Sequence, residues 1–308
     1  LLLAPLALMV IVLGGFFGYR YITPVKQIES IAVMPFVNES GNADVEYLSD
    51  GMTETLISSL TQLPNLNVKA RSSVFRYKGK ETDTKTIGKE LNVQAILTGR
   101  VAQRGEQLNL SLELVDVATE NAIWSQQYSR KQSDLVTLQS EIARDVSSKL
   151  KSKLSNADVA SVEKNYTANS EAFQLYLQGR YQWNKRETKA FEKAVEFFKQ
   201  AIEKDPNYAL AYSGLADTYS LFPAYGNFRP KDYMPQGKQA ALKALELDPN
   251  LAEAHASLGE AIFYYDYDWA GAEKAFKRAI LVRTCLKPSR AMPTAWRVSS
   301  VKRAFSLR

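Results

Sequence analysis

Apolar and polar positions follow three different patterns along the chain, and each pattern predicts a different kind of structure. Residues 1–18 are uncharged and apolar, which is long enough for a membrane-spanning helix. Residues 30–154 mix short apolar runs, period-two alternation and helical stripes. From residue 171 to about residue 280 the periodicity is purely helical. The patterns therefore predict a transmembrane helix, then an α/β domain, then an all-α region.

The first region is predicted to be a transmembrane helix over residues 1–19, followed by a linker over residues 20–29. A Tyr-Arg-Tyr segment supplies an interfacial edge after the apolar run. A signal-peptide core is the alternative, but the run is long and no small-residue cleavage site follows it. Because the sequence starts at Leu1 inside the apolar run, we interpret it as a fragment with a truncated start.

Residues 30–154 are predicted to form a small α/β sandwich domain. A continuous apolar run at residues 30–36 indicates a buried strand, and leucines alternate with polar residues over 108–114, which indicates a half-buried strand. The same rules predict further strands at 65–77, 93–101 and 123–128, and helices at 45–63, 84–91 and 133–154. The resulting order is β-α-β-α-β-β-β-α.

A polar linker is predicted at residues 155–170, and residues 171–280 then carry a repeated pattern. Spacings of four, three and five positions occur twice, in Ala194, Phe198, Ala201 and Pro206 and again in Gly237, Ala241, Ala244 and Pro249. An aromatic residue, a Leu-Gly pair, Ala-x3-Phe and a Pro over about 34 residues are typical of tetratricopeptide repeats. The pattern predicts a helix-pair solenoid of about two and a half repeats.

Residues 281–308 interrupt that pattern and contain no acidic residue. The whole chain has 39 Lys and Arg against 33 Asp and Glu, a formal charge of +6. Seven of the basic residues lie in this tail, so the preceding residues hold 32 basic and 33 acidic side chains. The basic balance is therefore weak evidence for nucleic-acid binding by the body. We interpret the segment as a frame-shifted or chimeric basic tail; a genuine basic arm or a membrane-surface segment is the alternative.

Chemistry-bearing residues are few. The single cysteine, Cys285, and the single histidine, His255, exclude an intramolecular disulfide and a Cys/His zinc site built by this chain alone. We find no P-loop, no Gly-x-Gly-x-x-Gly and no kinase signature. We therefore expect no catalytic, cofactor-binding or metal-binding residue and no enzyme activity in these residues.

Two charged sets and one aromatic set remain as candidates for binding. We interpret the acidic set as a solvated helix face and the basic set as an exposed strand end; they are Asp44, Glu46, Asp50 and Glu54, and Arg71, Arg76, Lys78 and Lys80. Aromatic side chains can anchor a partner on the concave surface of a repeat array. The candidate partner-binding residues are Tyr176, Tyr181, Trp183, Tyr212 and Tyr219.

Several sequence blocks resemble a known domain combination. The block IAVMPFVNESGNADVEYLSDGMTETLISSL, together with ILTGRV and IARDVSSKL, resembles the TolB-amino-terminal-like, FlgO-like domain of bacterial membrane-anchored regulators. The block FQLYLQGRYQWNKR resembles the start of the tetratricopeptide array that follows it in that family. There, both domains lie C-terminal to a serine/threonine kinase, winged-helix or nucleotide cyclase effector and to one transmembrane helix.

This resemblance implies a single-pass protein of the inner, cytoplasmic membrane with extracytoplasmic soluble domains. We expect a non-enzymatic sensory or scaffold region that binds a protein or peptide partner in the repeat groove and relays to an effector upstream. The alternatives are the C-terminal part of a receptor-type serine/threonine kinase and part of a winged-helix transcriptional regulator. A homodimer is a further possible partner arrangement, and we expect no nucleic-acid partner and no cofactor.

Overall fold

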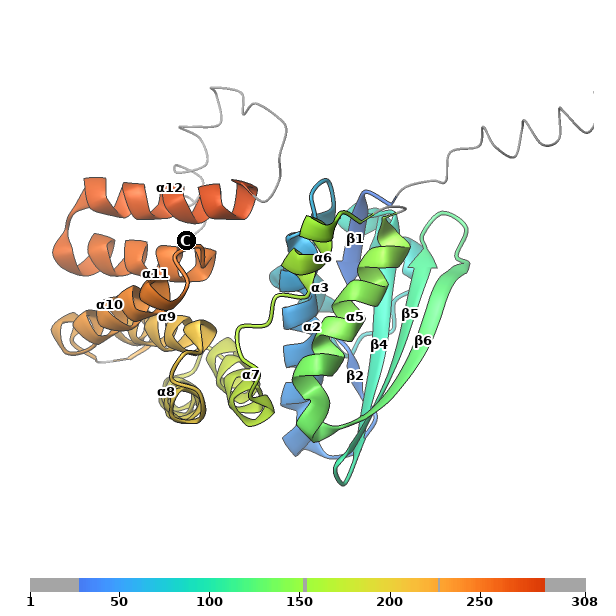
Figure 1. The fold of residues 1–308 in the computed structure, drawn as a ribbon, viewed down its shortest axis with the longest axis horizontal. Helices are drawn as coiled ribbons and strands as arrows, with labels where there is room; N and C mark the ends of the chain where they lie inside the picture. The colour runs from blue at the N-terminus through green and yellow to red at the C-terminus, as the bar shows by residue number, and fades with distance from the viewer. Residues whose placement is uncertain (1–27, 152–153, 227, 286–308) are drawn as a thin grey trace, which may run out of the picture.

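A computed structural model describes residues 28–151, 154–226 and 228–285. The predicted transmembrane helix at 1–19, nearly all of the 20–29 linker and the tail from residue 286 lie outside these ranges. Within them, no helix combines the length and the apolar character needed to cross a membrane. The described chain forms a mixed α/β domain with a wholly helical region beside it (Figure 1).

Within the described residues, six strands form one mixed sheet in the order β3-β1-β4-β5-β6, with β2 also paired to β4. The strands are β1 (Ser30–Val33), β2 (Val37–Asn38), β3 (Asn67–Val68), β4 (Ala95–Arg104), β5 (Gln107–Asp116) and β6 (Ala122–Lys131). The pairs β1–β3, β1–β4 and β2–β4 are parallel, and β4–β5 and β5–β6 are antiparallel. As predicted, the alternating leucines of β5 are buried on one face.

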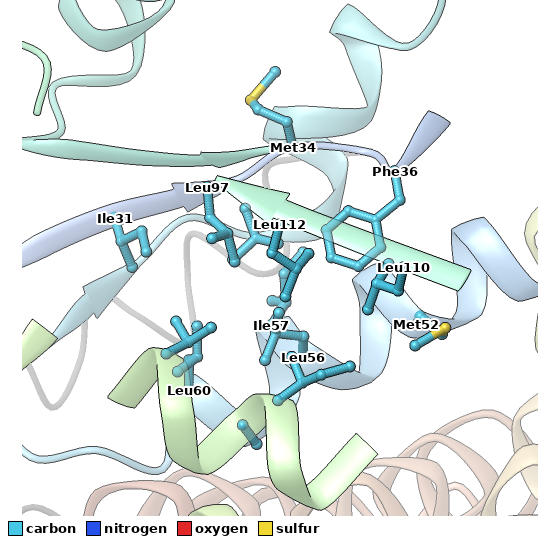
Figure 2. Close-up of a cluster of buried hydrophobic side chains, with 14 of the residues drawn as sticks. Ile31, Met34, Phe36, Met52, Leu56, Ile57, Leu60, Leu97, Leu110 and Leu112 are labelled. Carbon is cyan, nitrogen blue, oxygen red and sulfur yellow. The ribbon is translucent and has the colours of Figure 1, made fainter. Parts of the chain in front are cut away.

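Helices pack against this sheet and complete the core of the α/β domain. They are α2 (Glu46–Thr61), α3 (Arg71–Val74), α4 (Thr84–Leu91), α5 (Leu135–Leu150) and α6 (Asn156–Val162), with short 3-10 turns at Ala43–Val45, Phe75–Tyr77 and Gln132–Asp134. Figure 2 shows side chains of α2 meeting those of the sheet, Met52 and Leu56 among them, opposite Leu97, Leu110 and Leu112. Burial of such aliphatic groups is the main force that holds the domain together.

Three elements differ from the sequence prediction. The strand expected at 65–77 is reduced to β3, and the chain then turns into α3 because Arg71 forms an ion pair with α2 and stacks over Phe75 at 3.6 Å. The predicted linker at 155–170 contains α6, whose start is fixed by a reciprocal capping box between Ser155 and Asp158. The preceding α5 ends at Leu150 rather than at 154.

The C-terminal region consists of helices that follow one another in antiparallel pairs. They are α7 (Ser170–Asn184) and α8 (Thr188–Lys204), α9 (Ala209–Tyr225) and α10 (Pro230–Leu247), and α11 (Ala252–Ala261) and α12 (Trp269–Cys285), with a π-helical segment at Ile262–Asp266. Each helix contacts the next along the chain, an arrangement consistent with a helical solenoid. The third pair has both of its helices, and α12 continues past the predicted boundary at residue 280.

Small residues let these helices approach closely, as the repeat pattern predicted. Phe198 of α8 is fully buried, and a Cβ atom added to Gly179 of α7 or Gly214 of α9 would lie 2.6 Å from its ring. The third pair uses the same device, because a Cβ on Gly259 would lie 2.8 Å from the Phe276 ring. Such separations are far below van der Waals contact, so side chains at these glycines would force the helices apart.

Candidate functional site: a cleft between the α/β domain and the helical region

The α/β domain and the helical region meet where α7 packs directly on α2. Leu177 of α7 is buried and lies over Gly51 of α2, where an added Cβ would come within 2.9 Å of its Cδ2 atom. The main hydrophobic core is continuous through this contact and includes Phe173 and Leu177 together with the sheet residues. The first helix of the solenoid is therefore part of the α/β core.

A cleft of about 860 Å³ opens beside this contact. Its walls come from α2, α5 and α6 on one side and from α7, α9, α11 and α12 on the other. Clefts of this size between domains are typical binding sites for small molecules and peptide segments. The cleft is the main candidate functional site among the described residues.

Arg180 of α7 is the centre of a polar network at this cleft. Its Nε and Nη2 atoms donate to Glu54 Oε1 at 2.8 and 2.6 Å, and its Nη1 atom donates to Asp217 Oδ2 at 3.3 Å. Arg71 adds a second cation to Glu54 at 3.1 Å, and Ser257 of α11 donates to Asp217. With its side chain only 17% exposed, Arg180 links α2 of the α/β domain to α9 and α11 of the solenoid.

Burial and charge act in opposite directions on these groups. Burial disfavours ionisation of Glu54, but Arg180 and Arg71 more than offset it and hold the pKa of Glu54 below its usual value. For Asp217 burial dominates, and its pKa is raised despite the attraction of Arg180. Burial also opposes the charge of Arg180, yet Glu54 raises the pKa of the guanidinium. Arg180 therefore stays charged, and Glu54 is its principal counter-ion.

The acidic face of α2 is not solvated, which corrects the sequence interpretation. Asp50 is buried, and together with Glu46 it forms an ion pair with Lys78. Glu54 binds Arg71 and Arg180 as described above. Arg71 and Lys78 of the basic set, together with Arg180, thus neutralise the three carboxylates of α2. The remaining members are exposed: Asp44 precedes α2, Arg76 pairs with Glu90, and Lys80 lies at the surface.

The five candidate partner-binding aromatics do not form one surface. Tyr176 packs between Phe198 and Tyr208, with ring centroids 5.9 and 5.3 Å away, and it lines the cleft. Tyr219 is only 6% exposed and packs on Phe222 and Tyr233. Contact between Tyr219 and a partner would therefore require the helices to separate.

The other three candidates are half-buried. Trp183 lies between two guanidinium groups, with Arg186 at 3.6 Å and Arg180 at 4.3 Å from its ring centroid. Tyr181 has Lys185 over its ring at 4.5 Å, and Tyr212 packs beside a small buried cluster of α9, α10 and α11. These three rings keep an accessible edge, and partner binding by them stays a prediction.

The lone histidine has a local role in the structure. Its Nε2 atom lies 2.9 Å from the Pro249 carbonyl oxygen, within hydrogen-bonding distance, at the start of α11. In the described part of the chain, no group of three or more His, Cys, Asp or Glu side chains is arranged to hold a metal ion.

Comparisons with known proteins found partial similarity to a protein named as a putative adenylate cyclase and to transcriptional regulators. The family "HilA/YgeH-like transcriptional regulator, second domain" matches residues 26–145. A protein of Rhizobium meliloti (strain 1021) named "Putative adenylate cyclase 3" is 29% identical over 234 residues, covering 76% of this chain and 40% of the relative. The transcriptional regulator HilA of Salmonella typhimurium is 31% identical over 85 residues, covering 28% of this chain and 15% of that protein. The chain thus spans well under half the length of either relative.

Two solved structures align with part of the chain. The lipoprotein GNA1162 from Neisseria meningitidis aligns with a TM-score of 0.31 and 19% identity, over 39% of this chain and 98% of that one. TolB from Acinetobacter baumannii aligns with a TM-score of 0.32 and 12% identity, over 43% of this chain and 31% of that one.

Proposed function

We propose that this chain is a non-enzymatic sensory or scaffold region of a membrane-anchored signalling protein. In this proposal the helix pairs are tetratricopeptide repeats that bind a protein partner, and the α/β domain relays the bound state to an effector domain elsewhere in a longer polypeptide. Residues 1–19 serve as the membrane anchor, with the soluble domains on the extracytoplasmic side of the inner membrane.

One observation supports a relay above all others. The Glu54–Arg180–Asp217 network joins the α/β domain to two successive pairs of the solenoid through groups that are mostly buried. A partner that displaces α9 or α11 must therefore disturb the carboxylate of Glu54 on α2. Coupling of this kind needs a physical connection between the two sites, and separating the partners of a buried ion pair is costly because it leaves a buried charge uncompensated.

The relatives support a regulatory setting with a variable output. One is named for a cyclase and the others for transcriptional regulation, and in each the similar segment is a minor part of a longer protein. A shared sensory region attached to different effectors accounts for both names. A receptor-type kinase and a winged-helix regulator are alternative parents, and the similarity to proteins named as transcriptional regulators favours the second of these.

Site-specific photo-crosslinking in the bacterial host tests the partner-binding part. A crosslinking amino acid placed at Trp183 or Tyr212 is expected to capture one defined protein. The same residue at Leu242, which is 50% exposed on α10, is the matched surface control. Crosslinks of equal yield at Leu242, or none at Trp183 and Tyr212, would contradict partner binding at these rings.

A further inference from the structure

The cleft contains two buried polar side chains whose hydrogen-bonding groups are unused. Gln139 of α5 is 7% exposed, and among the described residues neither its amide nitrogen nor its carbonyl oxygen has a partner. Ser213 of α9 is 2% exposed, and in the same described ranges its hydroxyl has no partner. Both residues line the cleft, from opposite walls.

Unpartnered buried polar groups are costly, and native proteins contain few of them. A primary amide with both ends unused is the stronger case, because it offers two donors and an acceptor. An apolar residue of similar size at position 139 would avoid the cost. Retention of an amide there is explained if a ligand forms hydrogen bonds to it in the bound state.

Charges in the lining limit the class of ligand. Arg71 and Arg180 are matched by Glu54 and Asp217, and Lys164 is paired with Asp248 at 2.8 Å. These three cations are therefore already neutralised. The lining also holds Arg278, whose Nη2 atom lies 3.5 Å from Asn250 Oδ1, and the carboxylate of Glu253. The charges of the lining thus nearly balance, and a strongly anionic ligand would have to compete with carboxylates that are in place. Phe173 and Tyr176 contribute apolar ring surface to the same cleft.

We propose that the cleft binds an uncharged small molecule that carries hydroxyl or amide groups and one apolar face, with Gln139 and Ser213 as its hydrogen-bonding partners. Because these residues belong to the α/β domain and the solenoid respectively, such a molecule would bridge the two regions. The inference concerns the cleft alone and does not depend on the protein partner proposed above.

Stability of the free protein provides a test that needs no ligand. Gln139→Leu removes the unused amide, so it is expected to raise the Tm of the free protein by about 2–4 °C. Ser213→Ala is expected to raise it less. Ser220→Ala is the matched control for Ser213→Ala. The Ser220 hydroxyl lies on the same helix and, like that of Ser213, is buried and without a partner among the described residues. Unlike Ser213, Ser220 does not line the cleft. A lower Tm for Gln139→Leu would show that the amide is structural and would overturn the proposal.

Calorimetric titration with named probes provides the second test. N,N′-diacetylchitobiose carries hydroxyl and acetamide groups without charge, and a blocked dialanine amide carries amides alone. At least one of these two probes is expected to bind the wild type and Ser220→Ala with the same affinity. Its affinity for Gln139→Leu is expected to be at least tenfold lower. AMP serves as the charged probe of comparable size. The proposal fails if neither uncharged probe binds, if Gln139→Leu binds them unchanged, or if AMP is preferred. Probe binding without crosslinks at either Trp183 or Tyr212 would overturn the partner proposal only.

Discussion

The α/β domain and the solenoid are held together by different kinds of packing. The domain core is built mainly of leucine, isoleucine and valine, spread over a sheet and the helices that cover it. The solenoid instead places large rings against glycine and alanine, as where Phe198 fills the space beside Gly179 and Gly214. A core made of many similar aliphatic side chains can repack after one of them is truncated. A single ring that fills one gap between helices cannot be replaced by its neighbours in this way. We therefore expect the solenoid to be the more sensitive region.

The boundary between the two kinds of packing does not coincide with the boundary in sequence. Helix α7 belongs to the solenoid by its pairing with α8, yet its Phe173 and Leu177 belong to the core of the α/β domain. The rest of the solenoid has two smaller clusters, one shared by α8, α9 and α10 and one of four residues in or next to α9, α10 and α11. Stability is thus expected to fall along the solenoid with distance from the α/β domain, as in linear repeat arrays.

The largest expected effect comes from removing the ring that joins α7, α8 and α9. Phe198→Ala would leave a cavity against two glycines, which cannot fill it, and is expected to lower the free energy of unfolding by about 3–5 kcal/mol. Urea unfolding followed by circular dichroism measures this. Leu56→Ala in the aliphatic core is the comparison; a larger loss there than for Phe198→Ala would reverse the contrast between the two regions.

The next effect comes from the network at the junction. Arg180→Leu would leave Glu54 and Asp217 without their main cation and is expected to cost on the order of 3 kcal/mol. The surface pair Arg144–Glu163, with Arg144 52% exposed, supplies the control Arg144→Leu, for which about 0–1 kcal/mol is expected. Equal losses for the two variants would show that the junction network adds no more than a surface ion pair.

Two carboxylates of that network are expected to respond oppositely to pH. The pKa of Glu54 is lowered from 4.5, so its contribution is present above that value and is lost as pH falls through the lowered folded pKa. The pKa of Asp217 is raised from 3.8, so its ionisation reduces stability as pH rises from 3.8 through the raised folded pKa.

Unfolding of Glu54→Gln and Asp217→Asn across the acid range separates the two responses. Glu54→Gln is expected to lower the free energy of unfolding at neutral pH by about 1.5–3 kcal/mol. It is also expected to reduce the loss of stability that the wild type shows as the pH falls into the acid range. Asp217→Asn is expected to leave neutral stability unchanged or to raise it. A loss at neutral pH for Asp217→Asn as large as that for Glu54→Gln would contradict the assignment of Glu54 as the principal counter-ion of Arg180.

The smallest effect concerns local opening of the last helix pair. The segment between α11 and α12 exposes Tyr265 and Tyr267, whereas Tyr208 between α8 and α9 is buried. Brief chymotrypsin treatment is therefore expected to cut first at the exposed tyrosines, since exposed and weakly held segments open most readily. First cleavage at Tyr208 would show that the connection between the first and second pairs opens more readily than the last pair.

Sequence periodicity predicted those elements whose signals are local. The helix over 84–91 has the predicted bounds, because Asp83 caps it and Asn92 ends it in a left-handed conformation. The alternation of apolar and polar residues likewise predicted β5, and the leucines on one face predicted α2. Glycine and alanine at repeat positions predicted the close helix pairs.

The cleft could not be predicted in the same way, because its contacts join distant parts of the chain. Arg180 and Glu54 are separated by 126 positions, and no periodicity or motif relates them. Considered alone, Glu54 belonged to a charged face, and a charged face is normally exposed. The strand expected at 65–77 failed for a related reason, since Arg71 and Lys78 turn toward carboxylates of α2. Gln139 and Ser213 carried no signal at all.

Native-state hydrogen exchange on the unmodified chain tests most directly whether the α/β domain and the first helix of the solenoid form one unit. If they do, slowly exchanging amides of α2 and α7 open with the same free energy and the same denaturant dependence, while those of α11 and α12 open at lower free energy. If α7 instead opens together with α11 and α12 while α2 stays protected, the junction is a contact between independent domains, and the relay proposed through Arg180 loses its structural basis.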